Sequence, residues 1–138
     1  MTTTHSAPQH TDAFLEFWRE RHYATLTTHR PDGTPHVVPV SVTYEPGTGT
    51  ARVVASRTSK KARNVAAAGA DGMRVALCQV DGRRWATLEG TATVRTAPED
   101  IADAERRYEE RYGRPPRPNP ERVLLHIAVS RTMSRGLK

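Results

Sequence analysis

Apolar and polar residues alternate along six segments of the chain, which is the pattern of strands with one buried face. Residues that favour turns, such as Pro, Asp and Gly, separate these segments. The predicted strands cover residues 23–29, 36–44, 51–56, 74–80, 84–96 and 122–134. Asp81-Gly82 predicts a hairpin turn, and Gly90 predicts a bulge or bend within the fifth strand. Pro39 removes a backbone donor from the second strand, so we expect that strand at an edge or bulge.

Three other segments place apolar residues at helical spacing and carry residues typical of helix ends. Asp12 is the expected N-cap of the first helix, which covers residues 12–22. Ser59 is the expected N-cap of the second helix, and Gly69 fits the position after its end. The third helix covers residues 98–112. The stripe of this helix expected to face the strands is Ile101, Glu105, Tyr108 and Tyr112. Hairpin-linked strands with three helices predict a small antiparallel barrel.

The length of 138 residues is that of one domain, which we place at residues 12–138. Residues 1–11 show no periodicity and are predicted to form a disordered tail. Cys78 is the single cysteine and lies in an apolar run, which predicts a buried free thiol in a reducing, cytoplasmic setting. No apolar stretch is long enough for a membrane span or a signal peptide, so we expect no membrane partner.

Basic residues outnumber acidic ones by 21 to 15, for a net charge of +6, which favours an anionic partner. That partner could be a nucleic acid, a phosphorylated cofactor or a polycarboxylate. Nucleic-acid surfaces usually add exposed aromatics or a reading helix, and aromatic residues make up only 6% of the chain, so we expect no nucleic-acid partner. The histidines show no metal-binding spacing, and the usual glycine-rich dinucleotide and P-loop motifs are missing from the sequence.

Basic and hydroxyl side chains gather where the third strand passes into the second helix. The unpaired N–H groups and the positive dipole end of a helix N-terminus favour an anion there. The alternative is a solvated basic face, but the hydroxyls favour a specific phosphate site. Its candidate residues are Arg52, Ser56, Arg57, Thr58, Ser59, Lys60 and Lys61.

Two further basic segments carry candidate binding residues. Trp85 follows Arg83 and Arg84, and this group either packs at the rim of the barrel or forms a wall for a flat ring, with an arginine meeting a carboxylate. Arg114, Arg117 and Arg122 belong to or follow a proline-rich loop, where they are either solvated or cover an anionic ligand.

Four segments carry a resemblance to a known family: RHYATLTTHRPDGTPHVVPVSVTYE, ARVVASRTSKKARNV, QVDGRRWATLEGTATV and RYGRPPRPNPERVLL. Together they resemble the pyridoxamine 5′-phosphate oxidase-like split-barrel family, whose members bind FMN or the deazaflavin coenzyme F420. The resemblance covers about residues 12–135. Through QVDG-x-RW, LEG and PRPNP it extends to the small F420-dependent members, among them biliverdin reductases. It implies a mainly β, α+β fold, namely a six-stranded antiparallel split β-barrel with flanking helices.

The resemblance also implies a homodimer with two cofactor sites between the subunits. Residues implied to hold the cofactor phosphate are Arg52, Ser56, Thr58, Ser59, Lys60 and Lys61, with Arg57 beside them. Residues implied to lie near the tricyclic ring are Val38, Pro39, Val40, Ser41 and Gln79, with Trp85 reaching the ring pocket of the partner subunit. Candidate contacts to a substrate carboxylate are Arg83, Arg84, Arg117 and Arg122. The chain lacks the long C-terminal W-x-P segment of vitamin B6 oxidases, which argues against that substrate.

The implied activity is hydride transfer from reduced F420 to a conjugated acceptor, such as biliverdin or a similar bilin or enone. Because the cofactor carries the hydride, no side chain is identified as a general acid or metal ligand. Three alternatives stay open: an FMN-dependent split-barrel oxidoreductase, a non-catalytic protein that binds F420, haem or a bilin, and a basic nucleic-acid-binding barrel.

Overall fold

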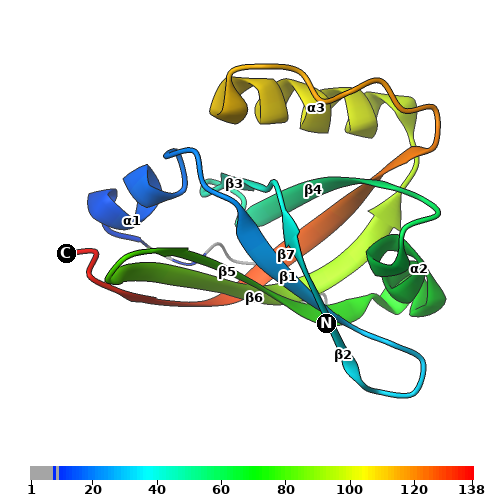
Figure 1. The fold of residues 1–138 in the computed structure, drawn as a ribbon, viewed down its shortest axis with the longest axis horizontal. Helices are drawn as coiled ribbons and strands as arrows, with labels where there is room; N and C mark the ends of the chain where they lie inside the picture. The colour runs from blue at the N-terminus through cyan, green and yellow to red at the C-terminus, as the bar shows by residue number, and fades with distance from the viewer. Residues whose placement is uncertain (1–7, 9) are drawn as a thin grey trace, which may run out of the picture.

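Seven antiparallel strands form one sheet in the order β2-β1-β5-β6-β7-β4-β3 in the computed structural model, which describes residue 8 and residues 10–138 (Figure 1). The strands are β1 (Ala24–His29), β2 (Pro35–Val40), β3 (Thr43–Glu45), β4 (Thr50–Ser56), β5 (Met73–Asp81), β6 (Arg84–Arg95) and β7 (Arg122–Arg135). The helices are α1 (Asp12–Phe17), α2 (Lys60–Ala67) and α3 (Pro98–Tyr112), with a 3-10 turn at Gly69–Asp71. The predicted antiparallel split barrel with flanking helices is confirmed, with seven strands instead of six.

The extra strand arises because the segment predicted as one strand over residues 36–44 is interrupted at Ser41 and Val42. The backbone of Val42 is bonded to side chains of α3 instead of to a neighbouring strand. Its N–H donates to the Tyr112 hydroxyl at 3.1 Å, and its carbonyl accepts from Nη1 of Arg111 at 2.6 Å. These tertiary contacts turn the chain out of β2 and start β3.

Local signals along the strands behave as predicted at two positions. Pro39 lies in β2, which is an edge strand of the sheet, so the donor that proline lacks is not needed by a second neighbour. Gly90 lies at a register shift between β6 and β7. A Cβ atom at Gly90 would overlap the carbonyl oxygen of Ala128, so the close approach of these two strands requires glycine.

The helix ends agree with the sequence in two of three cases. The Ser59 hydroxyl accepts from the N–H of Ala62 at 3.3 Å and caps α2. Helix α3 begins at Pro98 and ends before Gly113, which has a φ of +80°. The N-cap of α1 is Thr11, not Asp12, and α1 stops at Phe17 instead of continuing to residue 22.

The predicted disordered tail, residues 1–11, lies mostly outside the described residues. At its end, the His10 ring accepts or donates a hydrogen bond with the Tyr44 hydroxyl at 2.6 Å, and it stacks on Phe14 at 4.3 Å between centroids. Among the described residues, no helix has the length and apolar character needed to cross a bilayer.

The core fills the inside of the curved sheet and is closed at one end by α1. Its largest fully buried side chains include Phe17, Leu26, Leu77, Leu88, Leu125 and Ile127. Helix α3 packs across β3, β4 and β7, but the residues that it buries are Ala104 and Arg111, not the predicted stripe, whose members are half-buried. Cys78 is free but half-buried, because it lies on the outer face of β5 and not in the core as predicted.

Candidate functional site

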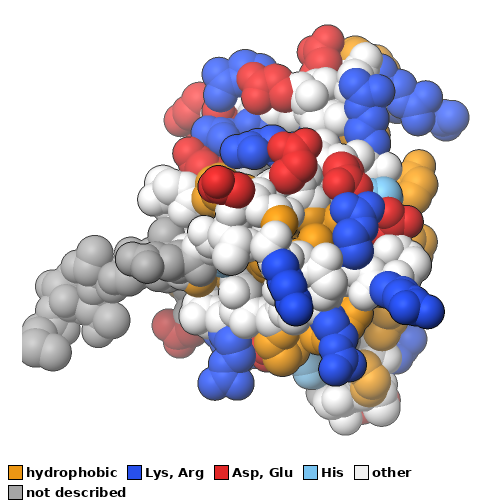
Figure 2. All heavy atoms as spheres, turned by 90° about the vertical axis from the view of Figure 1, so that its left-hand side faces the viewer, with side chains coloured by type: hydrophobic (Ala, Val, Ile, Leu, Met, Phe, Trp, Pro, Cys, Tyr) orange, Lys and Arg blue, Asp and Glu red, His pale blue; other side chains and the backbone are white. Residues whose placement is uncertain are grey.

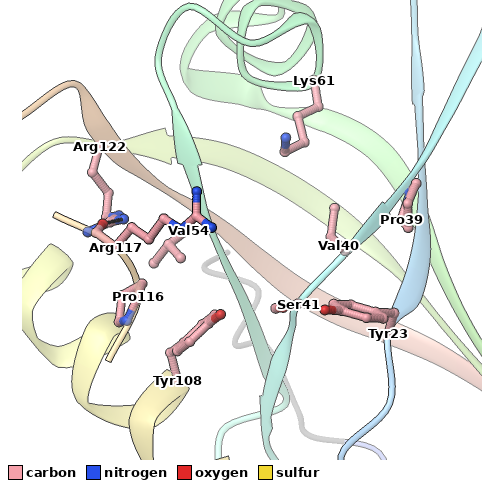
Figure 3. Close-up of a pocket in the computed structure, with 10 residues that line it drawn as sticks. All are labelled: Tyr23, Pro39, Val40, Ser41, Val54, Lys61, Tyr108, Pro116, Arg117 and Arg122. Atoms are coloured by element: carbon pink, nitrogen blue, oxygen red, sulfur yellow. Dashed lines mark hydrogen bonds between the residues drawn. The ribbon is translucent and has the colours of Figure 1, made fainter. Parts of the chain in front are cut away.

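A pocket of about 410 Å³ lies between the edge of β2 and the loop that precedes β7 (Figure 3). Its lining residues are Tyr23, Pro39, Val40, Ser41, Val54, Lys61, Tyr108, Pro116, Arg117 and Arg122. The structure therefore brings together six predicted site residues from three separate segments: Pro39, Val40, Ser41, Lys61, Arg117 and Arg122. Figure 3 shows Lys61 descending from α2 at the top of the pocket, with Tyr108 and Tyr23 at its lower side.

A second pocket, of about 290 Å³, shares three lining residues with the first: Tyr23, Ser41 and Tyr108. It adds Arg21, His22, Tyr112 and Arg114. The two pockets adjoin at these shared residues, and we refer to them together as the groove. We call the part with Lys61 the lysine end and the part with Arg114 the tyrosine end. No Asp or Glu lines either part.

The lysine end is electropositive. The first turn of α2 contains no acidic residue, and neither Lys60 nor Lys61 has an ion-pair partner among residues 10–138. Burial lowers the pKa of Lys61. Burial also lowers the pKa of His36, followed by the charges of Arg30, Lys60 and Lys61. His36 Nδ1 is buried without a hydrogen-bond partner. These features suit an anion that supplies the missing acceptors and negative charge.

The far wall of the groove is braced by Arg122. Its side chain is only 10% exposed, and Nη1 donates to Oε2 of Glu105 at 2.7 Å while Nη2 donates to the carbonyl of Arg117. Arg122 thus holds the proline-rich loop against α3. The guanidinium of Arg117 is exposed and has no partner among the described side chains, so it is available to an anionic ligand.

Five other predicted phosphate ligands lie in β4 or between β4 and α2 and are bonded to protein groups. Arg52 is 14% exposed and pairs with Glu45 at 2.9 Å and Asp103 at 3.7 Å. Arg57 pairs with Glu121. The hydroxyls of Ser56 and Thr58 are 3.1 Å apart, and the Ser59 hydroxyl donates to the carbonyl of Ser56 at 2.7 Å. None of these residues lines the groove.

The charges over α3 are likewise balanced locally. Figure 2 shows basic and acidic side chains side by side at the top of the molecule, where α3 lies. Arg106 and Arg107 both pair with Asp103, and Arg107 also contacts Glu45. The cations without a carboxylate partner are therefore more informative about ligands than the net charge of the chain.

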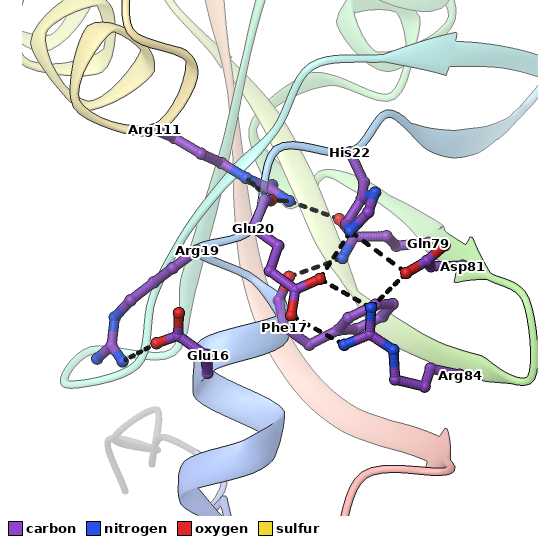
Figure 4. Close-up of polar contacts among 9 residues, drawn as sticks. All are labelled: Glu16, Phe17, Arg19, Glu20, His22, Gln79, Asp81, Arg84 and Arg111. Atoms are coloured by element: carbon purple, nitrogen blue, oxygen red, sulfur yellow. Dashed lines mark hydrogen bonds and ion pairs between the residues drawn. The ribbon is translucent and has the colours of Figure 1, made fainter.

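Gln79 was predicted to contact a cofactor ring, but its side chain lies inside the barrel with no exposed surface. Its Nε2 donates to the carbonyl of Phe17 at 2.9 Å, and its Oε1 accepts from Nη2 of Arg111 at 2.6 Å (Figure 4). Both ends of the amide are used within the fold. Val38 also packs against the core from the inner face of β2.

Arg84, a predicted substrate contact, is held by carboxylates of the protein (Figure 4). It donates two hydrogen bonds to Glu20, at 2.8 and 2.9 Å, and another to Asp81. The hydrogen bond from Arg84 lowers the pKa of Glu20 to about 2, with a further contribution from His22. Arg83 is exposed. A possible metal-binding group is formed by Glu20, His22 and Asp81, whose ligand atoms lie within 4.8 Å of one another. Arg84 pairs with both carboxylates, however, and its charge would repel a metal cation.

Trp85 lies outside the groove, on the outer face of β6. In the sheet register it stands opposite Val80 of β5 and Arg135 of β7. On the same outer face, four large hydrophobic side chains are exposed. They are Tyr23 (68%), Val37 (55%), Val80 (61%) and Met133 (46%).

At the tyrosine end of the groove, sequence reasoning named Arg114 as a candidate ligand contact but missed the tyrosines and Arg21. Tyr108 and Tyr112 belong to the helical stripe that was predicted to face the barrel. They also face the groove and the connection between β2 and β3. Arg21 belongs to a segment predicted as helix, so its contact with the end of α3 was not predicted.

The fold and the groove define a split barrel suited to a ligand with anionic groups. The family described as pyridoxamine 5′-phosphate oxidase matches residues 10–135, and the chain belongs to this family. A protein of Mycobacterium tuberculosis (strain CDC 1551 / Oshkosh), F420H(2)-dependent biliverdin reductase, is 44% identical over 133 residues, which cover 96% of this chain and 93% of that protein.

Solved structures show the same fold. Conserved hypothetical protein Rv2991 from Mycobacterium tuberculosis has a TM-score of 0.74 and 25% identity, with 96% of this chain and 89% of that chain covered. A protein described as F420 reductase has a TM-score of 0.68 and 22% identity, with 91% of this chain and 98% of that chain covered.

Proposed function

We propose that this protein is an F420H2-dependent reductase, which transfers a hydride from reduced coenzyme F420 to a conjugated acceptor, biliverdin or a similar bilin or enone. The observation that carries this proposal is the 44% identity to an F420H(2)-dependent biliverdin reductase over nearly the full length of both chains. Identity on that scale extends through the whole barrel and not only through a short binding motif.

The residues of the groove fit a phosphorylated cofactor. At the lysine end, Lys61 and the N-terminal turn of α2 offer positive charge and N–H groups, and the unpartnered Nδ1 of His36 lies nearby. We propose that this end binds the phosphate. Pro39 and Val40 of the β2 edge line the next part of the groove and would lie against the ring. When bound, the reduced cofactor supplies the hydride.

The protein itself contributes position and exclusion of water. Val54 and Tyr108 form an apolar and aromatic wall opposite the β2 edge, so a flat molecule in the groove is held between two faces. Holding donor and acceptor in contact in this way is the main contribution that a protein makes to hydride transfer from a cofactor.

We also propose that two copies of the chain form a homodimer through the outer face of the sheet. The four exposed hydrophobic side chains of that face support this, because a soluble domain rarely leaves such a group uncovered. Tyr23 belongs both to this face and to the groove, so dimerisation would complete the site. Val80→Glu should shift the protein from dimer to monomer in analytical ultracentrifugation. A dimer that survives this charge on the outer face would exclude the proposed interface.

The cofactor assignment is tested by titrating the purified protein with F420 and with FMN, followed by turnover with biliverdin. We expect F420 binding and a decrease in F420H2 absorbance that depends on biliverdin. Lys61→Ala should weaken F420 binding about tenfold or more, the range for hydrogen bonds to a charged group. Arg95→Ala is the matched control, since Arg95 is an exposed cation outside the groove.

Three results would contradict parts of this proposal. Retention of FMN with no response to F420 would make the protein an FMN-dependent oxidoreductase. Binding of F420 and biliverdin without consumption of F420H2 would make it a binding protein. If Lys61→Ala binds F420 with unchanged affinity, the lysine end does not bind the cofactor phosphate.

A further inference from the structure

The tyrosine end of the groove has a composition distinct from that of the lysine end. It combines three phenol rings, those of Tyr23, Tyr108 and Tyr112, with the guanidinium groups of Arg21 and Arg114. No carboxylate lines this pocket of about 290 Å³. Aromatic faces beside unpaired arginines suit a flat, conjugated body that carries a carboxylate.

Arg21 is fixed in place at this pocket. Its Nε donates to the carbonyl of Arg111 at 2.9 Å, in the last turn of α3, where the partial negative charge of the helix end favours a cation. Its guanidinium lies against Gly113, so closely that a Cβ atom there would stand 2.8 Å from Nη2. Both terminal nitrogens of Arg21 have no carboxylate partner among the described residues.

Arg114 directly follows Gly113 and lines the same pocket. Its side chain is exposed, and no described residue forms a hydrogen bond or ion pair with it. Arg84 and Arg122, which the sequence predicted as substrate contacts, are instead paired with Glu20 and Glu105. Arg114 therefore remains as a cation that a ligand carboxylate can approach without displacing a protein partner.

The aromatic wall is also held before any ligand arrives. The Tyr112 hydroxyl accepts from the N–H of Val42 at 3.1 Å and donates to the carbonyl of His22 at 2.9 Å. The ring of Tyr108 lies 5.0 Å from that of Tyr112 between centroids. A wall whose position is already determined loses little conformational entropy when a flat molecule binds to it.

The position of this pocket indicates which ligand it takes. Figure 3 shows Lys61 at the top of the groove and the shared residues Tyr23, Ser41 and Tyr108 at its lower side. If the phosphate binds at Lys61 and the ring lies along Pro39 and Val40, the tyrosine end lies beyond the ring, away from the phosphate.

We infer that the tyrosine end is the acceptor subsite, where Arg21 and Arg114 bind a carboxylate of a conjugated acceptor while Tyr108 and Tyr112 contact its flat body. This inference rests on the proposed function and adds to it the residues that recognise the acceptor. The same chemistry could serve a carboxylate of the cofactor's own tail, so the experiment separates these two sources.

The experiment compares wild type, Arg114→Gln and the control Arg95→Gln, since Arg95 is exposed but lies outside the groove. The dissociation constants of F420, of biliverdin and of biliverdin dimethyl ester are measured by optical titration, with no turnover needed. We expect Arg114→Gln to weaken biliverdin binding about three- to tenfold, since an exposed arginine contributes less than a buried one. The ester, which lacks the negative charge, should bind wild type and Arg114→Gln equally.

In turnover, Arg114→Gln should raise KM for biliverdin and leave kcat nearly unchanged, because the residue contacts the acceptor away from the reacting atoms. Equal weakening of the acid and the ester, or equal behaviour of Arg114→Gln and Arg95→Gln, would overturn the inference. So would weakened F420 binding with biliverdin binding intact, which would assign the pocket to the cofactor tail. If the wild-type protein binds F420 but not biliverdin, the acceptor subsite is refuted, whereas the proposal that the protein binds F420 is retained.

Discussion

Arg111 is a buried cation bonded only to neutral groups, and its replacement should be the most damaging single change on α3. Its side chain is 7% exposed. Its donors reach the Glu20 carbonyl at 2.6 and 3.0 Å, the Val42 carbonyl at 2.6 Å and the Gln79 amide oxygen at 2.6 Å. Burial lowers the pKa of Arg111, because the charged guanidinium loses its hydration inside the protein.

The size of the effect follows from these contacts. Arg111→Met keeps most of the side-chain volume but leaves the Glu20 carbonyl and the Gln79 amide oxygen without donors, and the Val42 carbonyl with only the Tyr112 hydroxyl at 3.2 Å. Each buried acceptor costs about 1–3 kcal/mol when unsatisfied. Relief from burying the charge offsets part of this sum. We therefore expect a loss of about 3–5 kcal/mol in the free energy of unfolding. With a urea slope of about 2 kcal/mol per molar, the midpoint falls by about 2 M.

The assay is urea unfolding followed by circular dichroism, with Arg106→Met as control. Arg106 is on the same helix, its side chain is 61% exposed, and it pairs only with Asp103, so its loss should cost less than about 1 kcal/mol. If Arg111→Met lowers the unfolding free energy no more than Arg106→Met, the carbonyls of Glu20 and Val42 do not depend on the guanidinium. The argument for a structural arginine then fails.

Three smaller perturbations test other parts of the fold. Gly90→Ala should lose about 2–4 kcal/mol in thermal unfolding, because its Cβ meets a strand carbonyl, whereas Gly47→Ala, with open space around it, should change little. Ser59→Ala should lose about 1 kcal/mol by removing the cap of α2, and an unchanged melting temperature would refute the capping role. The folded-state pKa of Glu20, about 2, lies below its ordinary value of 4.5, so its ion pair stabilises the protein above about pH 4.5 and loses this effect as pH falls toward 2. Glu20→Gln should accordingly cost about 1 kcal/mol at pH 7, with a difference from wild type that shrinks below pH 4.5 in urea unfolding.

Local chemistry explains why so much of the fold could be predicted from the sequence. Pro98 and Gly113 define the ends of α3 through backbone preferences that need no tertiary contact. The break between β2 and β3 could not be predicted, because the bonds that cause it come from Arg111 and Tyr112, seventy residues away. Alternation of apolar residues continues through Ser41, so the pattern alone indicates one strand.

The residues of the candidate site likewise include some that the sequence could predict and some that it could not. Lys61 and Arg117, which the sequence singled out as ligand contacts, both line the pocket. Lys61 stood out because it belongs to the first turn of a capped helix, and Arg117 because its loop is rich in proline. The bond between Gln79 and Arg111 could not be predicted, because a glutamine in an alternating strand gives no sign of a buried arginine that needs its oxygen. The tyrosine end of the groove was missed because it forms only where α3 meets the β2–β3 connection.

The open edge of β2 has a further consequence for the protein in concentrated solution. An unpaired strand edge is a template on which a strand of another molecule can add, and repeated addition leads to aggregation. Pro35 and Pro39 both lie on this edge and cannot donate backbone hydrogen bonds to an incoming strand. The chain can therefore keep one side of its ligand groove uncovered without inviting the growth of fibrils from it.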